Sequence, residues 1–213
     1  MQPLPYFQDR TDAGEQLVER LRPHRDRIDL VLGLSGGGVE VAAPIARALG
    51  LPLHIAVIET GGGTLHRLEA TSRMRASLRG AGFLDAAPST ADAGHARFEA
   101  DLAELEARHA AHHDLPPVED RRVLLVDDGL HPDTQVQAAL QALRSAGAAS
   151  IILATPLMTE ASATHHGPAC DEIIALHRPD DYGAATEYYV DPTPPTPDRV
   201  RALVAELSGQ APT

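Results

Sequence analysis

Apolar and amphipathic segments alternate along most of the chain, and this alternation predicts strands and helices in turn. Several short segments are mostly apolar, which is typical of buried strands: residues 29–34, 53–58, 123–126, 150–155 and 173–176. Longer segments place apolar residues at helical spacing: residues 11–21, 39–49, 96–113, 134–146 and 198–207. Because strands alternate with helices, we expect a doubly wound, mainly parallel α/β sheet.

Glycines mark the ends of several predicted elements. Gly50 and Gly147 each follow a predicted helix, at the position where glycine commonly ends one. The run Gly36–Gly38 follows the first predicted strand, and we expect it to break that strand and open a helix at about Val39. The first strand, this helix and the second strand then form a βαβ unit, which packs right-handed.

One long interval, Thr60 to Pro117, interrupts the alternation. It begins with Gly61–Gly63 and contains a stretch of small residues from Gly80 to Gly94. We interpret it as an insertion that forms a cap. We expect the remainder to complete a single domain over residues 1–213, with a tail helix at about 198–207 after a proline-rich linker.

The most informative stretch is residues 123–130, Val-Leu-Leu-Val-Asp-Asp-Gly-Leu. It reads as a buried parallel strand that ends in Asp127 and Asp128, at the sheet edge where open α/β folds bind ligands. Adjacent carboxylates repel each other, and ribose hydroxyls, a divalent cation or a developing positive charge would each offset that repulsion. The alternative is a turn or helix-start pair that contacts no ligand.

The strand and its acid pair resemble the signature of type I phosphoribosyltransferases. Three further segments resemble the family. Residues 7–14 are similar to its opening, residues 32–39 to its first strand and pyrophosphate loop, and residues 182–191 to its closing segment. The resemblance implies that the interval from Thr60 to Pro117 is the hood that covers the substrate base. It covers nearly the whole chain and is weakest in that interval.

The resemblance also implies roles for particular residues. Asp127 and Asp128 would hold the ribose hydroxyls of phosphoribosyl pyrophosphate (PRPP), and Asp128 would also stabilise positive charge at the anomeric carbon. Mg²⁺ would be required, because the family handles PRPP as its magnesium complex, and both carboxylates would meet the ion through the ligand. The implied ligand contacts are Ser35, Gly36, Gly37 and Gly38 for the pyrophosphate, and Gly129, Leu130, His131, Asp133, Thr134 and Tyr182 for the rest of the ligand.

The loop after the acid pair departs from the family pattern. Where the family has a loop of Thr-Gly-x-Thr type, this chain has His131-Pro132-Asp133-Thr134-Gln135. Pro132 lacks an amide donor, and Asp133 adds a negative charge where a phosphate would lie. Two like charges about 4 Å apart cost about 1 kcal/mol in water and several times more in a sheltered site. The alternative, which we favour, is that Asp133 caps the following helix, and His131 would offset the negative charge if its pKa were raised.

Positive charge is missing at two further positions. Gly36 stands where the family often has an arginine, and Glu59-Thr60 replaces a basic pair after the second strand. Arginines of the hood are an alternative source of that charge: Arg67, Arg73, Arg75 and Arg79. Two hypotheses follow. In the first, the chain is a phosphoribosyltransferase-like protein that binds PRPP or a nucleoside 5′-phosphate and transfers a phosphoribosyl group to an unidentified base. In the second, it keeps the fold as a catalytically degenerate binding or regulatory protein.

The composition of the chain disfavours several classes of binding partner. Of 213 residues, 30 are acidic and 18 are Lys or Arg, giving a formal net charge of −12, which argues against a nucleic-acid or anionic-membrane surface. No apolar run approaches the roughly 20 residues of a membrane span, and the first residues show no secretory signal. The single Cys170 excludes an intrachain disulfide and fits a reducing compartment. We expect a cytoplasmic protein with a phosphate-bearing small-molecule ligand and, by resemblance, a homodimer.

Two other chemistries fit parts of the sequence. Residues 33–37 read G-x-S-x-G, so Ser35 is a candidate hydrolase nucleophile, with an acid from the pair and His165, His166 or His177 completing a triad. Against this, such an elbow normally follows several strands, and here it follows the first. His109 and His113 share a helical face and are candidate zinc ligands, although histidines near a helix end also favour its dipole.

Aromatic residues are scarce, at 3% of the chain, so their positions are informative. Tyr182 and the pair Tyr188-Tyr189 lie in the tail, where the family often stacks an aromatic ring on the base. Each is a candidate flat surface for a ligand. Packing in the core or at an interface is the competing interpretation for each of them.

Overall fold

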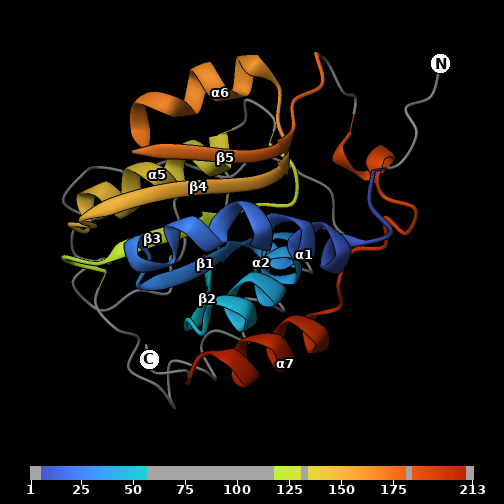
Figure 1. The fold of residues 1–213 in the computed structure, drawn as a ribbon, viewed down its shortest axis with the longest axis horizontal. Coiled ribbons are helices and arrows are strands. Elements are labelled where there is room, and N and C mark those ends of the chain that lie inside the picture. Colours follow the sequence, from blue (N-terminus) through green and yellow to red (C-terminus); the bar gives the residue numbers. More distant parts are fainter. Residues whose placement is uncertain (1–5, 57–117, 131–133, 181–183, 210–213) are drawn as a thin grey trace, which may run out of the picture.

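The centre of the protein is a parallel β-sheet. The computed structural model describes residues 6–56, 118–130, 134–180 and 184–209. Within them, five strands pair in the order β2-β1-β3-β4-β5, and every pairing is parallel (Figure 1). The strands are β1 (Leu30–Leu34), β2 (Leu53–Ala56), β3 (Arg122–Val126), β4 (Ser150–Leu157) and β5 (Glu172–His177).

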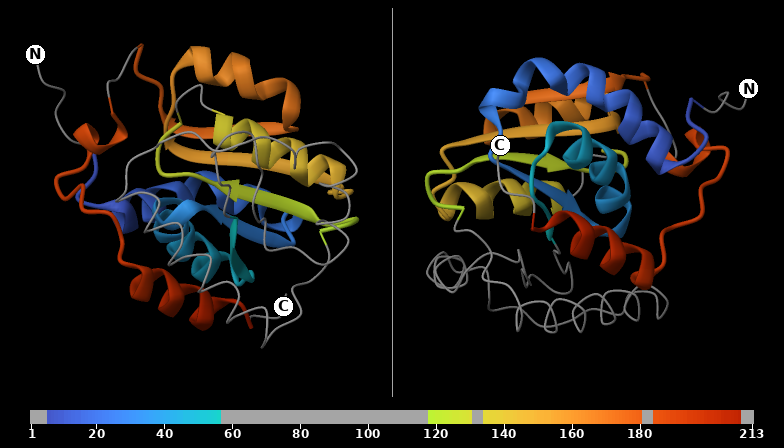
Figure 2. Two further views of the ribbon diagram at one scale, coloured as in Figure 1. Left: turned by 180° about the vertical axis from the view of Figure 1, so that it is seen from behind. Right: turned by 60° about the horizontal axis from the view of Figure 1, so that its bottom comes forward.

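Helices cover both faces of this sheet, as Figures 1 and 2 show. The helices are α1 (Arg10–Leu21), α2 (Ser35–Leu49), α5 (Thr134–Ser145), α6 (Glu160–His166) and α7 (Pro197–Leu207), with short 3₁₀ turns at Arg22–Arg27, Gly167–Ala169 and Ala185–Tyr188. Apolar residues of α1, α2 and α7 form one core with the sheet, and those of α5 form a second core on the opposite face. The predicted doubly wound α/β fold is confirmed.

Successive residues of each strand point to these two cores in turn. Leu124 and Val126 of β3 lie in the α1/α2/α7 core, whereas Val123 and Leu125 lie in the α5 core. This alternation follows from the period of two in a strand. It also explains why the strand sequences are mostly apolar, since a parallel sheet is covered on both sides.

Helix α2 starts earlier than the sequence indicates. We expected it at about Val39, but it begins at Ser35, so the glycine run forms its first turn. The reason is close packing: a Cβ on Gly38 would lie 2.6 Å from the Val126 carbonyl oxygen, so only glycine fits against β3. Ser35 enters this turn with φ at 61°, in the left-handed region.

Other predicted boundaries agree within a few residues. Gly50 and Gly147 end their helices with φ values of 61° and 82°, as the C-terminal glycine pattern predicts. Strand β4 runs on to Leu157, and α6 was not predicted; Thr159 caps it by accepting a hydrogen bond from the Ser162 amide. The hood and the predicted 96–113 helix lie outside the described residues. No helix in the described ranges is long and apolar enough to cross a membrane.

Candidate functional site

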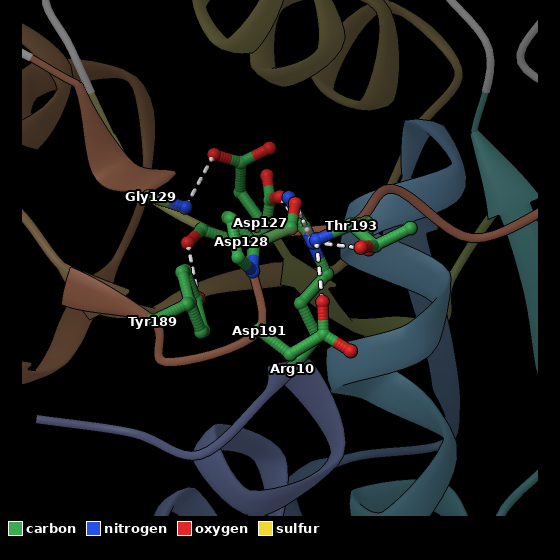
Figure 3. A network of polar contacts seen from close by, with 8 residues as sticks. Arg10, Asp127, Asp128, Gly129, Tyr189, Asp191 and Thr193 are labelled. Atoms are coloured by element: carbon green, nitrogen blue, oxygen red, sulfur yellow. Dashed lines mark hydrogen bonds and ion pairs between the residues drawn. The ribbon is translucent and has the colours of Figure 1, made fainter. Parts of the chain in front are cut away.

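Asp127 and Asp128 lie at the carboxyl end of β3, in the middle of the sheet. The Asp127 amide still pairs with the Ala154 carbonyl of β4, at 3.1 Å, so the backbone at this residue is fixed. Its carboxylate is largely buried, and its Oδ2 accepts a hydrogen bond from the Gly129 amide at 3.2 Å. The two carboxylates point in different directions, one toward Gly129 and the other toward Arg10 (Figure 3).

Asp128 forms an ion pair with Arg10. The Arg10 Nε lies 2.6 Å from the Asp128 Oδ2, and the two side chains are 6% and 23% exposed. The Arg10 Nη1 also donates to the carbonyls of Pro192 and Thr193, at 3.1 and 3.0 Å (Figure 3). Its guanidinium carbon is 5.2 Å from the centre of the Tyr189 ring. One buried arginine therefore contacts Asp128 of the acid pair and residues 189–193, which lie in the segment before α7 that we call the tail.

Sequence reasoning did not select Arg10, although it noted residues 7–14 as a familiar opening. A signal was present. Arg10 is the first residue of α1, where the helix dipole disfavours a cation. An arginine at such a position is expected to pair with an acceptor outside the helix. That partner is 118 residues away in the sequence, and only the fold reveals it.

The first turn of α2 lies against the acid pair. A Cβ on Gly37 would be 2.3 Å from the Asp128 Oδ2, so this glycine lets the carboxylate approach the helix backbone. Helix starts leave backbone N–H groups without intrahelical partners, which suits them to bind anions. We call the arrangement of Asp127, Asp128 and residues 35–38 the acid-pair site. The fold thus brings together two predicted groups that are far apart in sequence.

Gly129 and Leu130 continue from the acid pair into the protein interior. A Cβ on Gly129 would be 2.3 Å from that of Ala185, so the tail packs directly on this glycine. The Leu130 side chain is fully buried, and its amide donates to the Leu157 carbonyl at 2.8 Å. We expected Leu130 among the ligand contacts. Its side chain instead packs in the core, and its N–H is already used within the protein.

Several predicted site residues lie outside the described part of the chain. These are His131, Asp133 and Tyr182, and nothing is described of the Thr134 side chain. Glu59-Thr60, the hood arginines and the candidate zinc ligands His109 and His113 lie outside it too. The roles expected of these residues stay predictions.

The aromatic residues of the tail that are described pack inside the protein. Tyr188 and Tyr189 are almost completely buried, in a small cluster with Phe7. The Tyr189 hydroxyl donates to the Asp128 carbonyl at 2.7 Å. The packing interpretation holds for these two residues, and Tyr189 additionally holds the backbone of the acid pair in place.

The geometry opposes a Ser-Asp-His triad. Ser35 follows β1 and His177 ends β5, three strand spacings away, which is roughly 14 Å because neighbouring strands lie about 4.8 Å apart. The His177 ring stacks on Tyr6, with 4.1 Å between ring centres. His166 is buried, with its Nδ1 3.2 Å from the Gln137 Oε1, and His165 contacts the His166 ring. These histidines are thus engaged on other parts of the sheet.

Asp127 and Asp128 are also candidate ligands of Mg²⁺. No group of three His, Cys, Asp or Glu side chains in the described part of the chain is arranged to hold a metal. Both acids have a carboxylate oxygen that accepts a hydrogen bond within the protein. Mg²⁺ prefers six oxygen ligands and usually keeps waters and substrate phosphates among them. Among the described residues, this donor set fits an ion that arrives with a phosphate ligand.

Glu40, on the second turn of α2, adds to the acidic character of this region. Burial raises the pKa of its carboxyl above the usual value, while Arg10 and Arg199 oppose that shift. On the tail, Asp191 accepts hydrogen bonds from Thr193, and these lower its pKa. Within this acidic region, Arg10 supplies the positive charge that pairs with Asp128.

Comparison with known proteins assigns the family. Residues 8–192 match the family described as "Phosphoribosyl transferase domain", so the chain belongs to that family. Two relatives from Mycobacterium tuberculosis, of strains CDC 1551 / Oshkosh and ATCC 25618 / H37Rv, are 30% identical over 210 residues, and both are named "Putative phosphoribosyl transferase". The match covers 94% of this chain and 47% of each relative, so the chain spans about half their length.

A solved structure supports the same assignment. The crystal structure of TT1426 from Thermus thermophilus superposes with a TM-score of 0.71 at 27% identity. The match covers 95% of this chain and 99% of that one. The resemblance noted from the acid pair and the flanking motifs is confirmed at the level of family and fold.

Proposed function

We propose that this protein binds PRPP, as its magnesium complex, at the acid-pair site and transfers the phosphoribosyl group to a base. One observation carries the proposal: in a chain of this family, the Asp128 carboxylate lies directly against Gly37 in the first turn of α2. The acids that we propose bind ribose therefore lie beside backbone amides that we propose bind pyrophosphate. A substrate that carries both groups would span the two.

The chemistry follows from these two groups. Asp127 and Asp128 accept hydrogen bonds from the ribose hydroxyls, and the amides of residues 35–38 hold the pyrophosphate. The bond from the anomeric carbon to the pyrophosphate oxygen breaks, and its electron pair leaves with pyrophosphate. A base nitrogen then bonds to that carbon and loses its proton to solvent. Positive charge develops on the ribose, and a fixed carboxylate stabilises it.

The remaining contacts follow the family resemblance. Thr134 and nearby amides hold the 5′-phosphate, together with His131 and Gly129, and Tyr182 approaches the base. Bound Mg²⁺ would neutralise part of the pyrophosphate charge, and Asp127 and Asp128 would face it through ligand oxygens or waters. This matters in a chain with a net charge of −12, because a highly anionic ligand needs local positive charge.

A second candidate is a binding protein that has lost the transfer step. The observation that favours it is the Arg10–Asp128 ion pair, which already neutralises one of the two acids. Neutral or acidic residues at Gly36, Glu59 and Asp133 would also weaken the hold on pyrophosphate and phosphate. Such a protein would bind a nucleoside 5′-phosphate or serve as a regulatory partner.

Calorimetric titration separates the candidates. The wild-type protein is titrated with Mg-PRPP and then with a nucleoside 5′-monophosphate, and each is repeated with Asp127→Asn and with the control Asp198→Asn. Asp198 lies on the exposed start of α7 and pairs with Arg201. We expect micromolar binding of Mg-PRPP that weakens at least tenfold in Asp127→Asn and is unchanged in the control.

The other outcomes are equally informative. Binding of the monophosphate without Mg-PRPP would favour the binding protein. If neither titrant binds, the acid pair is not a ribose site, and the proposal is rejected. Where Mg-PRPP binds, a screen of bases for pyrophosphate release tests the transfer step itself.

A further inference from the structure

Arg10 joins three segments that are far apart in the sequence. It begins α1, its Nε lies 2.6 Å from the Asp128 Oδ2, and its Nη1 donates to the carbonyls of Pro192 and Thr193. The tail residues that follow Tyr189 also pair with the N-terminal segment. The Val190 and Asp191 amides donate to the carbonyls of residues 7 and 8, at 2.9 and 2.8 Å. The acid pair and the tail thus meet at a single side chain.

Helix geometry does not account for this placement. The start of α1 is already capped by Asp9, whose side chain accepts a hydrogen bond from the Asp12 amide at 2.8 Å. A cation at a helix start is unfavourable, and a buried one is destabilising unless it is paired and hydrogen-bonded. Arg10 is therefore held by Asp128 and the tail carbonyls, and the cap of α1 does not depend on its side chain.

The shape of the guanidinium suits it to this task. Its planar fork donates in several fixed directions at once, so it reaches the carboxylate and the two carbonyls together. Its carbon also lies 5.2 Å from the Tyr189 ring centre, within the range of a cation–π contact. A lysine at this position would keep the charge but would not satisfy all of these acceptors.

We propose that Arg10 is a positioning residue for the ribose site: it fixes the Asp128 carboxylate against α2 and couples it to tail residues 190–193. The inference rests on the proposed function, because it assigns Arg10 to the same acid pair. The inference also implies that the two carboxylates are held in place by different groups. Asp128 is held by Arg10, whereas Asp127 accepts its hydrogen bond from the Gly129 amide of its own loop.

A double-mutant cycle on ligand binding tests the first part. Affinity for Mg-PRPP is measured by calorimetry for wild type, Arg10→Lys, Asp128→Asn and the double variant. We expect Arg10→Lys to weaken binding about tenfold, and to add less than twofold once Asp128 is changed, because Arg10 acts through that carboxylate. If Arg10 did not act through Asp128, the two substitutions would weaken binding independently, and their fold losses in affinity would multiply in the double variant. Multiplied losses, or an unchanged affinity in Arg10→Lys, would overturn the inference.

Hydrogen exchange tests the second part without any ligand. In Arg10→Lys, and equally in Asp128→Asn, the Val190 and Asp191 amides should exchange at least fivefold faster than in wild type. The matched control is Arg47→Lys, on the exposed face of α2, where Arg47 pairs with Glu206. It should leave both affinity and exchange unchanged. If exchange in the tail does not respond to Arg10, the coupling is wrong.

The two measurements keep the hypotheses apart. If wild-type protein does not bind Mg-PRPP, the proposed function fails, and the amide exchange alone decides whether Arg10 couples Asp128 to the tail. If wild-type protein binds Mg-PRPP and Arg10→Lys binds equally well, the proposed function stands and the inference about Arg10 fails.

Discussion

Gly37 offers a sharp test of the acid-pair site, because a single methyl group there has opposite effects on the helix and on the site. A glycine-to-alanine change inside a helix normally stabilises by about 0.5–1 kcal/mol. Here the added Cβ would lie 2.3 Å from the Asp128 Oδ2, 2.6 Å from its Cγ and 3.1 Å from the Arg10 Nε. The carboxylate must therefore move, and its bond to Arg10 is strained or lost.

The magnitude follows from the two opposing effects. A hydrogen bond to a charged group contributes about 1.5–3 kcal/mol, which exceeds the helix gain. We expect Gly37→Ala to lower the free energy of unfolding by about 1–2 kcal/mol. For a chain of this size, each kcal/mol lowers Tm by about 2–4 °C. Mg-PRPP affinity should fall as well, because the displaced carboxylate occupies the space beside the α2 amides.

Thermal unfolding followed by circular dichroism, together with calorimetric titration, measures both effects. The control is Gly209→Ala, just after α7, where an added Cβ would meet nothing within 4 Å. That variant should be as stable as wild type or slightly more so. If Gly37→Ala matched its control in both stability and affinity, the close contact between Asp128 and α2 would not matter, and the reasoning would be refuted.

Two further predictions concern pH. Hydrogen bonds from Arg122 lower the pKa of Asp29 below its ordinary 3.8, so its contribution to stability is present above that pH and is lost as the pH falls through the lowered value. Urea unfolding of Asp29→Asn should show lower stability than wild type at pH 7 and a narrowing difference below pH 3.8; an equal difference at all pH values would count against the ion pair. Burial raises the pKa of the Cys170 thiol to about 11 from 9.0, so its contribution is present below pH 9 and is lost toward pH 11. A disulfide reagent at about pH 8 should label Cys170 slowly in the native protein and fast in urea, and fast native labelling would contradict the burial.

The sequence alone determined the class of fold and the location of the acids. Apolar strands, amphipathic helices and C-terminal glycines are local patterns, because each depends on a period of two or about 3.6 residues or on one backbone angle. Asp127 and Asp128 could be placed at the carboxyl end of a central strand because their own strand is recognisable. Their relation to residues 35–38 was implied by the family resemblance, which assigns both segments to one ligand, and it agrees with a parallel sheet, in which strand ends meet at one edge.

The tertiary structure alone decided how these acids are held. Arg10 and Asp128 are 118 residues apart, and no spacing in the sequence pairs them. Leu130 lies two residues after Asp128, yet its burial depends on α5 and β4, which lie later in the chain. The early start of α2 likewise reflects the packing of Gly38 on β3. Sequence periodicity records which side of an element is apolar, whereas the partner of a buried charge is set by which distant segments the fold brings within a few ångströms.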